Sequence, residues 1–353
     1  MFSQEYWKPI LSPTNYDLKK VCFVDSSNGW VVGDGGTIIK TTNGGDTWIS
    51  QPTQISSSII NFFALNKQNL FALSLDYSLD SGSLYGTVLL HSTNSGNTWS
   101  HLQFDSTFFY SIFFLDSLHG WMGGAYGVIM RTINGGVDWD LVSDASSSHL
   151  SVLNFNFLNR STAFAIGGFR DIAGVIWKTT NGGQRWQSTT VSGEPLAGMY
   201  CKDSLNILCV GGDVDFGASK VTTTDGGEHW TYKFLQIFGE PMALSFRTAS
   251  EGWSPLGFSG TMMYTLDSGA SWSSIFSPDS IPMHDVMFSD KRHGFMVGAE
   301  GRILKYNTAI LDVKEHSSGS IPSNNHLLQN YPNPFNPKTD LRFGITQSGL
   351  VTL

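Results

Sequence analysis

The stretch Thr41-Thr42-Asn43-Gly44-Gly45-Asp46-Thr47-Trp48 decides the fold of this 353-residue chain, because the chain repeats its pattern six times. The shared pattern is Ser/Thr-x-Asp/Asn-x-Gly-x-x-Trp, and the six copies end at Trp48, Trp99, Trp139, Trp186, Trp230 and Trp272. The steps between these tryptophans run from 40 residues, between 99 and 139, to 51 residues, between 48 and 99. A repeat of this length without helical periodicity is typical of a propeller with one blade per copy.

Each copy, called a box here, is expected to be a tight hairpin turn and not a catalytic loop. The glycines permit positive φ angles, and the Asn or Asp side chain can accept hydrogen bonds from its own turn. The strand after the turn carries the tryptophan, which can bury its ring against a neighbouring blade. The sequence therefore predicts structural roles for Asn43, Trp48, Asn94, Trp99, Asn134, Trp139, Asn181, Trp186, Asp225, Trp230, Asp267 and Trp272.

The composition also indicates an all-β protein. The chain has 38 Gly, 11 Trp and 24 Phe with only 14% charged residues, which fits many short strands, tight turns and an aromatic core. Its net charge of -8, without a basic cluster, argues against a nucleic acid or an anionic membrane as partner. No segment approaches the roughly 20 apolar residues of a membrane span.

The blade count predicts how the ring closes. Three strands within residues 283–306 begin a seventh blade, but no box follows them. Residues 5–12 resemble the segments that follow the boxes, and Trp7 stands where a box tryptophan would stand. We therefore predict a seven-bladed propeller over residues 1–310, in which the N-terminal strand completes the last blade and removes two exposed sheet edges.

The box resembles the Asp-box, or BNR, repeat of sialidases, sortilin-like receptors, xyloglucan-degrading enzymes and the photosystem II assembly factor family. The longer unit, residues 28–48, is most similar to the last of these, and the similarity spans about residues 5–307. The resemblance implies the propeller fold and says little about function, because these families do unrelated things. The assembly factors use a surface arginine patch, and the arginines here are few and scattered. We therefore do not expect that function to carry over.

The C-terminal region differs in composition from the repeats. Residues 311–326 are polar and read as a linker. Residues 327–353, with Asn330-Tyr331-Pro332-Asn333-Pro334-Phe335-Asn336-Pro337, resemble the start of the C-terminal sorting domain of the type IX secretion system of Bacteroidota and their relatives. The resemblance implies a partial sorting domain and a truncated C-terminal β segment. It also implies contact with the secretion machinery and a secreted or outer-membrane surface location. The N-terminus shows no basic region followed by an apolar one, so we expect any signal peptide to have been removed or lost.

Candidate ligand-binding residues lie on the face opposite the boxes. In a four-stranded blade this face carries the turns between second and third strands and the connections from outer to inner strands, where propeller ligands usually bind. The candidates are Asp34, Asp76, Asp80, Arg170, Asp213, Asp215, Glu300 and Arg302. Clustered acids such as Asp213 and Asp215 could hold calcium, but solvated loop acids are commoner. We expect no metal and no cofactor. The spacing of Cys22, Cys201 and Cys209 suits no metal, and a disulfide between the last two stays open.

The sequence favours a binding or scaffold module for a protein or glycan ligand, with no catalytic residue assigned. The alternative is a glycoside hydrolase of the sialidase-like group that uses acids such as Asp76, Asp213 or Glu300. The nearest match to the sialidase Phe-Arg-Ile-Pro signature is Phe246-Arg247-Thr248-Ala249, which lacks Ile-Pro. An assembly chaperone for an envelope complex is a third class. We therefore leave enzymatic activity uncertain and regard its absence as the better prediction.

Overall fold

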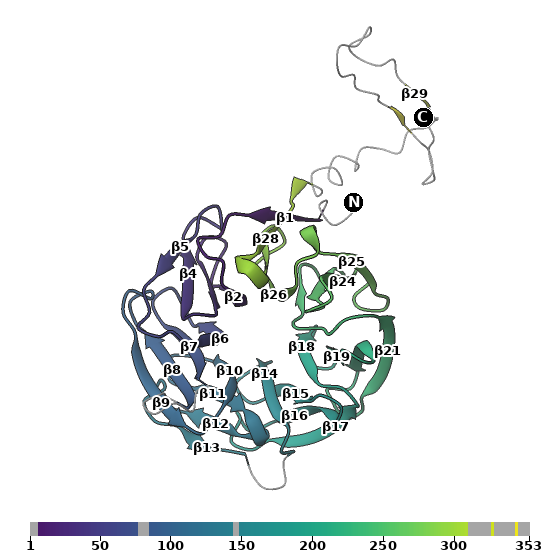
Figure 1. The fold of residues 1–353 in the computed structure, drawn as a ribbon. Coiled ribbons are helices and arrows are strands. Elements are labelled where there is room, and N and C mark those ends of the chain that lie inside the picture. The colour runs from purple at the N-terminus through teal and green to yellow at the C-terminus, as the bar shows by residue number, and fades with distance from the viewer. Residues whose placement is uncertain (1–5, 77–84, 144–147, 310–325, 328–342, 345–353) are drawn as a thin grey trace. The chain divides into compact units, whose positions relative to one another are not determined.

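A computed structural model describes residues 6–76, 85–143, 148–309, 326–327 and 343–344. The chain forms two compact units, Met1–Asn307 and Thr308–Leu353. The first unit consists of seven four-stranded antiparallel sheets arranged in a ring around a central axis (Figure 1). This arrangement confirms the all-β, seven-bladed prediction.

Each blade runs from an inner strand at the axis to an outer strand at the circumference. The strands of the first three blades are β2 (Leu18–Phe23), β3 (Gly29–Gly33), β4 (Thr37–Thr41), β5 (Ile49–Gln51), β6 (Ser58–Ala64), β7 (Leu70–Asp76), β8 (Gly86–Ser92), β9 (Ser100–Asp105), β10 (Phe109–Phe114), β11 (Gly120–Gly124), β12 (Ile129–Thr132) and β13 (Asp140–Leu141). The strands of the next three are β14 (Ser151–Phe157), β15 (Ala163–Phe169), β16 (Ala173–Thr179), β17 (Gln187–Ser192), β18 (Leu196–Cys201), β19 (Ile207–Asp213), β20 (Gly217–Thr223), β21 (Thr231–Ile237), β22 (Ser245–Phe246), β23 (Gly252–Pro255), β24 (Thr261–Thr265) and β25 (Ser273–Phe276). The last blade contains β26 (Met283–Phe288), β27 (Gly294–Gly298) and β28 (Ile303–Tyr306), and the short 3-10 segments are η1 (Ala125–Gly127), η2 (Pro278–Ser280) and η3 (Ala299–Gly301).

The N-terminal strand completes the seventh blade, as predicted. Strand β1 (Trp7–Ile10) pairs antiparallel with β28, and Trp7 lies opposite Tyr306. The two strands lie side by side in Figure 1 although some 300 residues of chain separate them. The Trp7 ring is fully buried and packs edge-on against Trp253 of blade six, with 5.5 Å between ring centroids. The closure therefore joins three segments: the N-terminus, blade six and blade seven.

The hydrophobic core lies between neighbouring blades. Two box tryptophans show this packing against the preceding blade: Trp48 packs in the cluster around Phe295, and the Trp230 ring lies 6.2 Å from the Phe164 ring between centroids. The aromatic ring thus occupies the wedge that opens between two twisted sheets as they radiate from the axis. The structural role of the box tryptophans stays a prediction.

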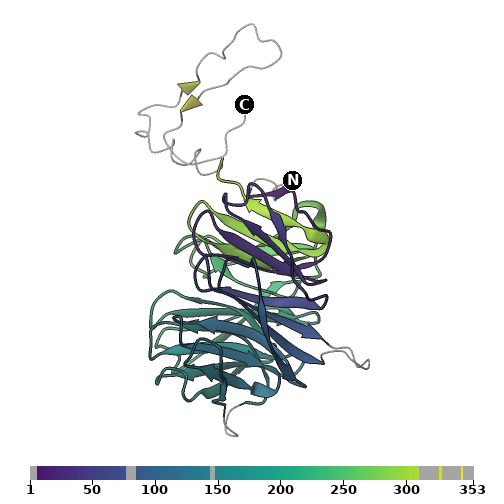
Figure 2. The same ribbon diagram turned by 90° about the vertical axis from the view of Figure 1, so that its left-hand side faces the viewer.

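The boxes all lie on one face of the ring, called the box face. In the first box, Gly45 N–H donates to Thr41 Oγ1 at 2.9 Å, and Thr47 N–H donates to Asn43 Oδ1 at 3.0 Å. Gly44 N–H also donates to the carbonyl of Ser27, in the turn between the first and second strands of the same blade. Figure 2 shows that the strands run from one face of the ring to the other. The remaining connections therefore gather on the opposite face, called the cavity face.

The seventh blade lacks a box, and hydrogen bonds to the Glu251 carboxylate stabilise it instead. Tyr306 stands at the strand position that Thr41 takes in blade one. Its hydroxyl donates to Glu251 Oε1 at 2.9 Å. Arg247 Nη2 and Trp253 Nε1 donate to the same carboxylate at 2.5 and 3.0 Å. Burial would raise the pKa of Glu251, but these hydrogen bonds outweigh it and lower the pKa. Arg247 therefore has a structural role here, past the end of β22.

In the second unit, the structure describes the paired strands β29 (His326–Leu327) and β30 (Phe343–Gly344). Most of the predicted linker and sorting segment, residues 311–353, lies outside the described residues, so those domain limits stay predictions. Among the described residues, no helix is long and apolar enough to cross a membrane.

Candidate functional site

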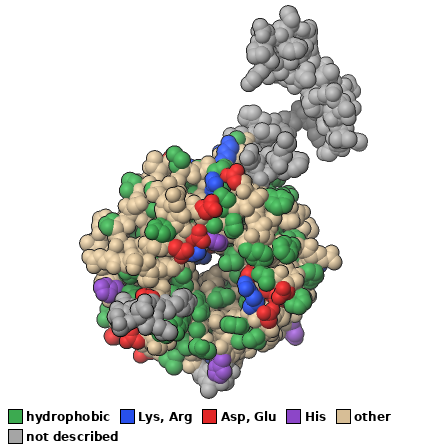
Figure 3. All heavy atoms as spheres, viewed as in Figure 1, with side chains coloured by type: hydrophobic (Ala, Val, Ile, Leu, Met, Phe, Trp, Pro, Cys, Tyr) green, Lys and Arg blue, Asp and Glu red, His purple; other side chains and the backbone are tan. Residues whose placement is uncertain are grey.

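The candidate site is a cavity of about 390 Å³ at the axis of the ring, lined by the inner strands or their leading segments from all seven blades. Figure 3 shows the surface hollowed near the centre of the ring, with Lys, Asp or Glu and His side chains beside the opening. Most lining residues come from the N-terminal ends of the inner strands or from the segments that lead into them, which lie at the cavity face. The opening therefore lies on the face opposite the boxes.

A repeated β-bulge builds the lining. In six blades the pairing between the inner strand and the second strand shifts near the N-terminal end of the inner strand. Each shift leaves one residue of the inner strand without a partner in the register. A bulge leaves one residue unpaired and redirects its side chain. The six residues passed over by the shift, together with Met242 of blade six, form a group called the bulge ring: Lys19, Ile60, Tyr110, Leu153, Ala197, Met242 and His284.

The bulge ring has an apolar side and a polar side. Blades two to six contribute Ile60, Tyr110, Leu153, Ala197 and Met242. Blades seven and one contribute His284 and Lys19. The cavity can therefore bury apolar groups against five consecutive blades and offer hydrogen bonds at the other two.

The polar side is a network of paired charges at the junction of blades seven and one. Lys19 Nζ lies 3.1 Å from Asp34 Oδ2 and 3.3 Å from Asp17 Oδ2. Lys20 Nζ lies 3.2 Å from Asp285 Oδ1, whose second oxygen accepts the backbone N–H of Val21 at 2.9 Å. Burial raises the pKa of Asp285, although the Lys20 charge and the Val21 hydrogen bond oppose that shift. The network ties the two blades where the ring closes.

Two more ion pairs lie on the cavity face. Arg170 Nη2 lies 2.5 Å from Glu240 Oε2, and Glu240 lines the cavity. Burial raises the pKa of Glu240, and the Arg170 charge opposes this. Arg302 Nη2 lies 3.3 Å from Asp279 Oδ2. Each arginine is thus held by a carboxylate from another connection.

Those predicted ligand-face residues that the structure describes lie outside the lining of the cavity. Asp34 accepts hydrogen bonds from Lys19 and Ser58, Arg170 and Arg302 form the pairs above, and the Glu300 N–H donates to Asp17. Asp213 is fully buried, and its Oδ1 accepts the N–H groups of Asp215 and Phe216 at 3.0 and 2.7 Å. Asp76 ends β7, and Asp80 lies outside the described residues.

These candidates do not converge on one pocket, and their role in binding stays a prediction. Within the described ranges, no group of three or more His, Cys, Asp or Glu side chains is placed to hold a metal ion. Cys209 pairs with Met199 across β18 and β19, and both Cys201 and Cys209 are free thiols. Burial raises the pKa of Cys201 to about 12, so this thiol stays protonated at neutral pH.

The bulge ring is not among the residues predicted from sequence, although the chain carries a signal for it. Every member lies ten residues before the first residue of the second strand of its blade, as 19 precedes 29 and 284 precedes 294. Aligning the repeats on the second strand would have found this position. The spacing alone does not show that the position faces the axis, because that depends on the bulge.

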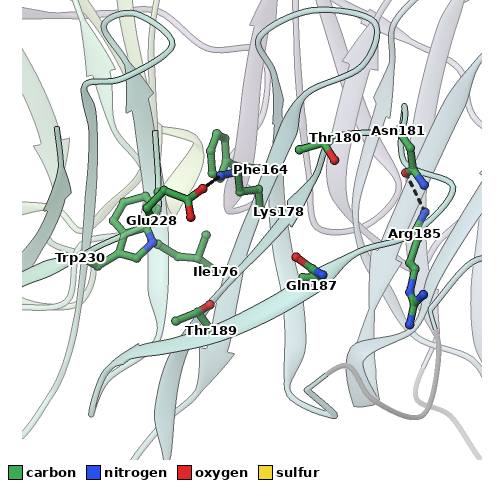
Figure 4. A pocket seen from close by; sticks show the side chains of 11 residues that line it. Phe164, Ile176, Lys178, Thr180, Asn181, Arg185, Gln187, Thr189, Glu228 and Trp230 are labelled. Atoms are coloured by element: carbon green, nitrogen blue, oxygen red, sulfur yellow. Dashed lines mark hydrogen bonds and ion pairs between the residues drawn. The ribbon is translucent and has the colours of Figure 1, made fainter. Parts of the chain in front are cut away.

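A second cavity, of about 350 Å³, lies between blades four and five and is less distinctive (Figure 4). Lys178 Nζ reaches Glu228 Oε1 across it at 2.5 Å, and the box tryptophan Trp230 forms one wall. A similar cavity lies beside Trp99, between blades one and two. Because both cavities lie between an outer strand and the neighbouring blade, we attribute them to the architecture.

The fold and the boxes define a seven-bladed Asp-box propeller with an axial cavity on the face away from the boxes. Within that class, the chain belongs to the family described as "Photosynthesis system II assembly factor YCF48", whose profile matches residues 1–108 and 196–307. It is 24% identical over 317 residues to the photosystem II assembly lipoprotein Ycf48 of Synechococcus sp. (strain CC9902), covering 86% of this chain and 89% of that protein. It is 23% identical over 334 residues to the chloroplastic photosystem II stability/assembly factor HCF136 of Arabidopsis thaliana, covering 85% of this chain and 79% of that protein.

Solved structures show the same fold. A structure titled "YCF48 bound to D1 peptide" matches with a TM-score of 0.68 and 20% identity, covering 85% of this chain and 96% of that one. The Niastella koreensis GH74 enzyme matches with a TM-score of 0.64 and 14% identity, covering 85% of this chain and 53% of that one. At these identities the likeness to both structures concerns the fold.

These findings correct the predicted function and location. The prediction of a secreted or surface-attached module exported by type IX secretion, with a carbohydrate-active enzyme as the alternative, is wrong, because the relatives are named photosystem II assembly lipoproteins and chloroplastic assembly factors. The proline-rich tail that suggested export is short, whereas the resemblance to the assembly factors covers most of the chain. A glycan ligand, the secretion machinery and a Bacteroidota-like source find no support in the comparisons.

Proposed function

We propose that this protein is an assembly factor that binds an extended segment of a client protein over the axial cavity. The observation that supports the proposal is the bulge ring, through which each of the seven blades presents one side chain to a single opening. A volume of about 390 Å³ accommodates a few side chains of a peptide and not a folded domain.

The lining suits a peptide ligand better than a small polar substrate. The apolar members Ile60, Tyr110 and Leu153 can bury side chains, whereas Asn61 and His284 supply hydrogen-bonding groups for a peptide backbone. The solved relative titled with a bound D1 peptide supports the same ligand class. By analogy with that relative, a segment of D1 is the first client to test.

The proposal is tested by titrating the propeller with a fluorescently labelled D1 peptide and measuring the anisotropy. We expect saturable binding to the unmodified chain. The substitution Leu153→Arg, which places a charge in the apolar side of the cavity, should weaken binding at least about tenfold, a loss of about 1.4 kcal/mol. The matched control is Leu205→Arg, at an exposed position in a turn on the box face.

Saturable binding that is weakened by Leu153→Arg and unchanged by Leu205→Arg would support the proposal. Absence of saturable binding of the D1 peptide, or equal weakening by both substitutions, would contradict it. Circular dichroism of each variant separates a loss of binding from a loss of folding.

A further inference from the structure

Exposed apolar side chains continue outward from the cavity over blades four to six. They come from the turns between second and third strands and from the connection between β21 and β22. We call them the apolar arc, which consists of Phe169, Ile172, Phe216, Phe238, Met242 and Phe258. Phe216 and Phe238 are 63% and 66% exposed, well above what a buried core aromatic shows. Figure 3 shows hydrophobic side chains gathered on this face beside the central opening.

Tight turns hold the arc in place. The buried Asp213 carboxylate accepts the backbone N–H of Phe216, so a fixed turn presents that ring to solvent. Phe169 ends β15 in a turn closed by the Ile172 N–H donating to its carbonyl at 3.2 Å. Phe238 packs edge-on against Phe258 with 5.7 Å between ring centroids. Ordering these rings on binding therefore costs little conformational entropy.

The arc is continuous with the cavity. The Arg170–Glu240 ion pair joins the turn of blade four to the segment that leads into blade six. Phe169 and Met242 are close neighbours of these two residues in the sequence, so the ion pair connects the two parts of the arc. Met242 belongs both to the arc and to the bulge ring, and Glu240 also lines the cavity. A ligand that enters the cavity thus meets the arc on one side.

The cations of this face are already neutralised. Among the described residues of the cavity face, Lys19, Lys20, Arg170 and Arg302 are its lysines and arginines, and each lies within 3.3 Å of a carboxylate oxygen. Asp171 and Asp215 add negative charge at the tips of the two hairpins that carry Phe169 and Phe216. An acidic ligand would be repelled there, and no cation is left to attract it.

We propose that the partner segment is uncharged and apolar, rich in aromatic or branched aliphatic side chains, and that it docks on the apolar arc with one end in the cavity. This inference rests on the proposed peptide-binding function and specifies the chemistry of the ligand. An exposed apolar surface of this kind, rimmed by paired charges, is typical of a protein-binding site. Affinity then comes from apolar burial and depends little on salt.

The inference is tested with a displayed library of random peptides of about 12 residues, selected on the purified full chain. We expect the selected clones to be enriched in Phe, Trp, Tyr, Leu and Ile and depleted in Asp and Glu relative to the input. Their affinity should change less than about twofold between low and high salt. The double substitution Phe216→Ser/Phe258→Ser should weaken them at least about tenfold, because it removes two exposed anchors.

The matched control is Val137→Ser/Leu205→Ser, which removes two exposed apolar side chains from the box face. Clones rich in charged residues, binding that falls steeply with salt, or equal loss in both double variants would overturn the inference. If the D1 peptide binds while such charged clones are selected, only this inference fails. If neither the D1 peptide nor any selected clone binds saturably, the proposed function fails with it.

Discussion

At the scale of single residues, the six boxes show how Asn and Asp can perform the same structural task. Asn43 Nδ2 donates to Thr47 Oγ1 at 2.9 Å, whereas Asp267 Oδ2 accepts from Ser271 Oγ at 2.6 Å. In both boxes the side-chain Oδ1 accepts a backbone N–H four residues later. The turn therefore needs an oxygen at this position and tolerates either a donor or an acceptor beside it. Only the Asp form can be titrated.

The substitution Asp267→Asn should therefore leave the neutral-pH melting temperature almost unchanged and reduce the sensitivity to acid. Hydrogen bonds from Ser271 lower the pKa of Asp267 to about 2 from the ordinary 3.8. Because the folded-state pKa is depressed, its stabilisation is present above pH 3.8 and is lost as the pH falls towards 2. The measurement is thermal unfolding at pH 7 and pH 3, and an unchanged acid-induced drop in the variant would contradict this account.

At the scale of elements, the closure of the ring depends on β1. This strand satisfies the edge of β28, and Trp7 fills the wedge against blade six. The sequence predicted this closure correctly because each piece of evidence is a short segment that can be recognised by itself. The box is missing at one end of the propeller, and a box-like tryptophan segment lies at the other. Strand positions were predictable for the same reason, since each hairpin turn marks its own neighbours.

The substitution Trp7→Ala should destabilise the propeller by about 3 to 5 kcal/mol, as expected for a large aromatic side chain removed from a core. Trp7 is fully buried and contacts Trp253, Phe288 and Tyr306. Lys8→Ala changes the exposed neighbour in the same strand and is the control, with an expected effect below about 0.5 kcal/mol. Urea unfolding of both variants measures the difference, and equal stability of the two would disprove the closure model.

The bulge ring could not be predicted in the same way. A bulge is a property of two paired strands, so no single strand sequence shows that Tyr110 or Leu153 is passed over by the pairing. Their approach to one axis also depends on the curvature of the whole ring. Acids such as Asp213 and Asp34 were predicted as ligand-binding residues because charged loop residues are easy to recognise in a sequence. In the structure, Asp213 accepts a hydrogen bond from its own turn and Asp34 pairs with Lys19.

At the scale of the whole molecule, the two faces of the ring carry different features. The boxes and their tryptophans hold the blades together on one side, and the bulge ring with the apolar arc lies on the other. Family membership rests on this propeller, which carries the similarity to the assembly factors. The tail that suggested export lies outside it.

The central claim is that a client peptide binds on the cavity face, and photocrosslinking tests it most directly. A benzoylphenylalanine introduced at Tyr110, in the bulge ring of blade three, is compared with one at Ile133, an exposed position in the box of the same blade. Each protein is irradiated with a labelled D1 peptide, and the covalent adduct is measured. We predict an adduct from position 110 and none from position 133. An adduct from position 133 alone, or equal yields from both positions, would contradict the account.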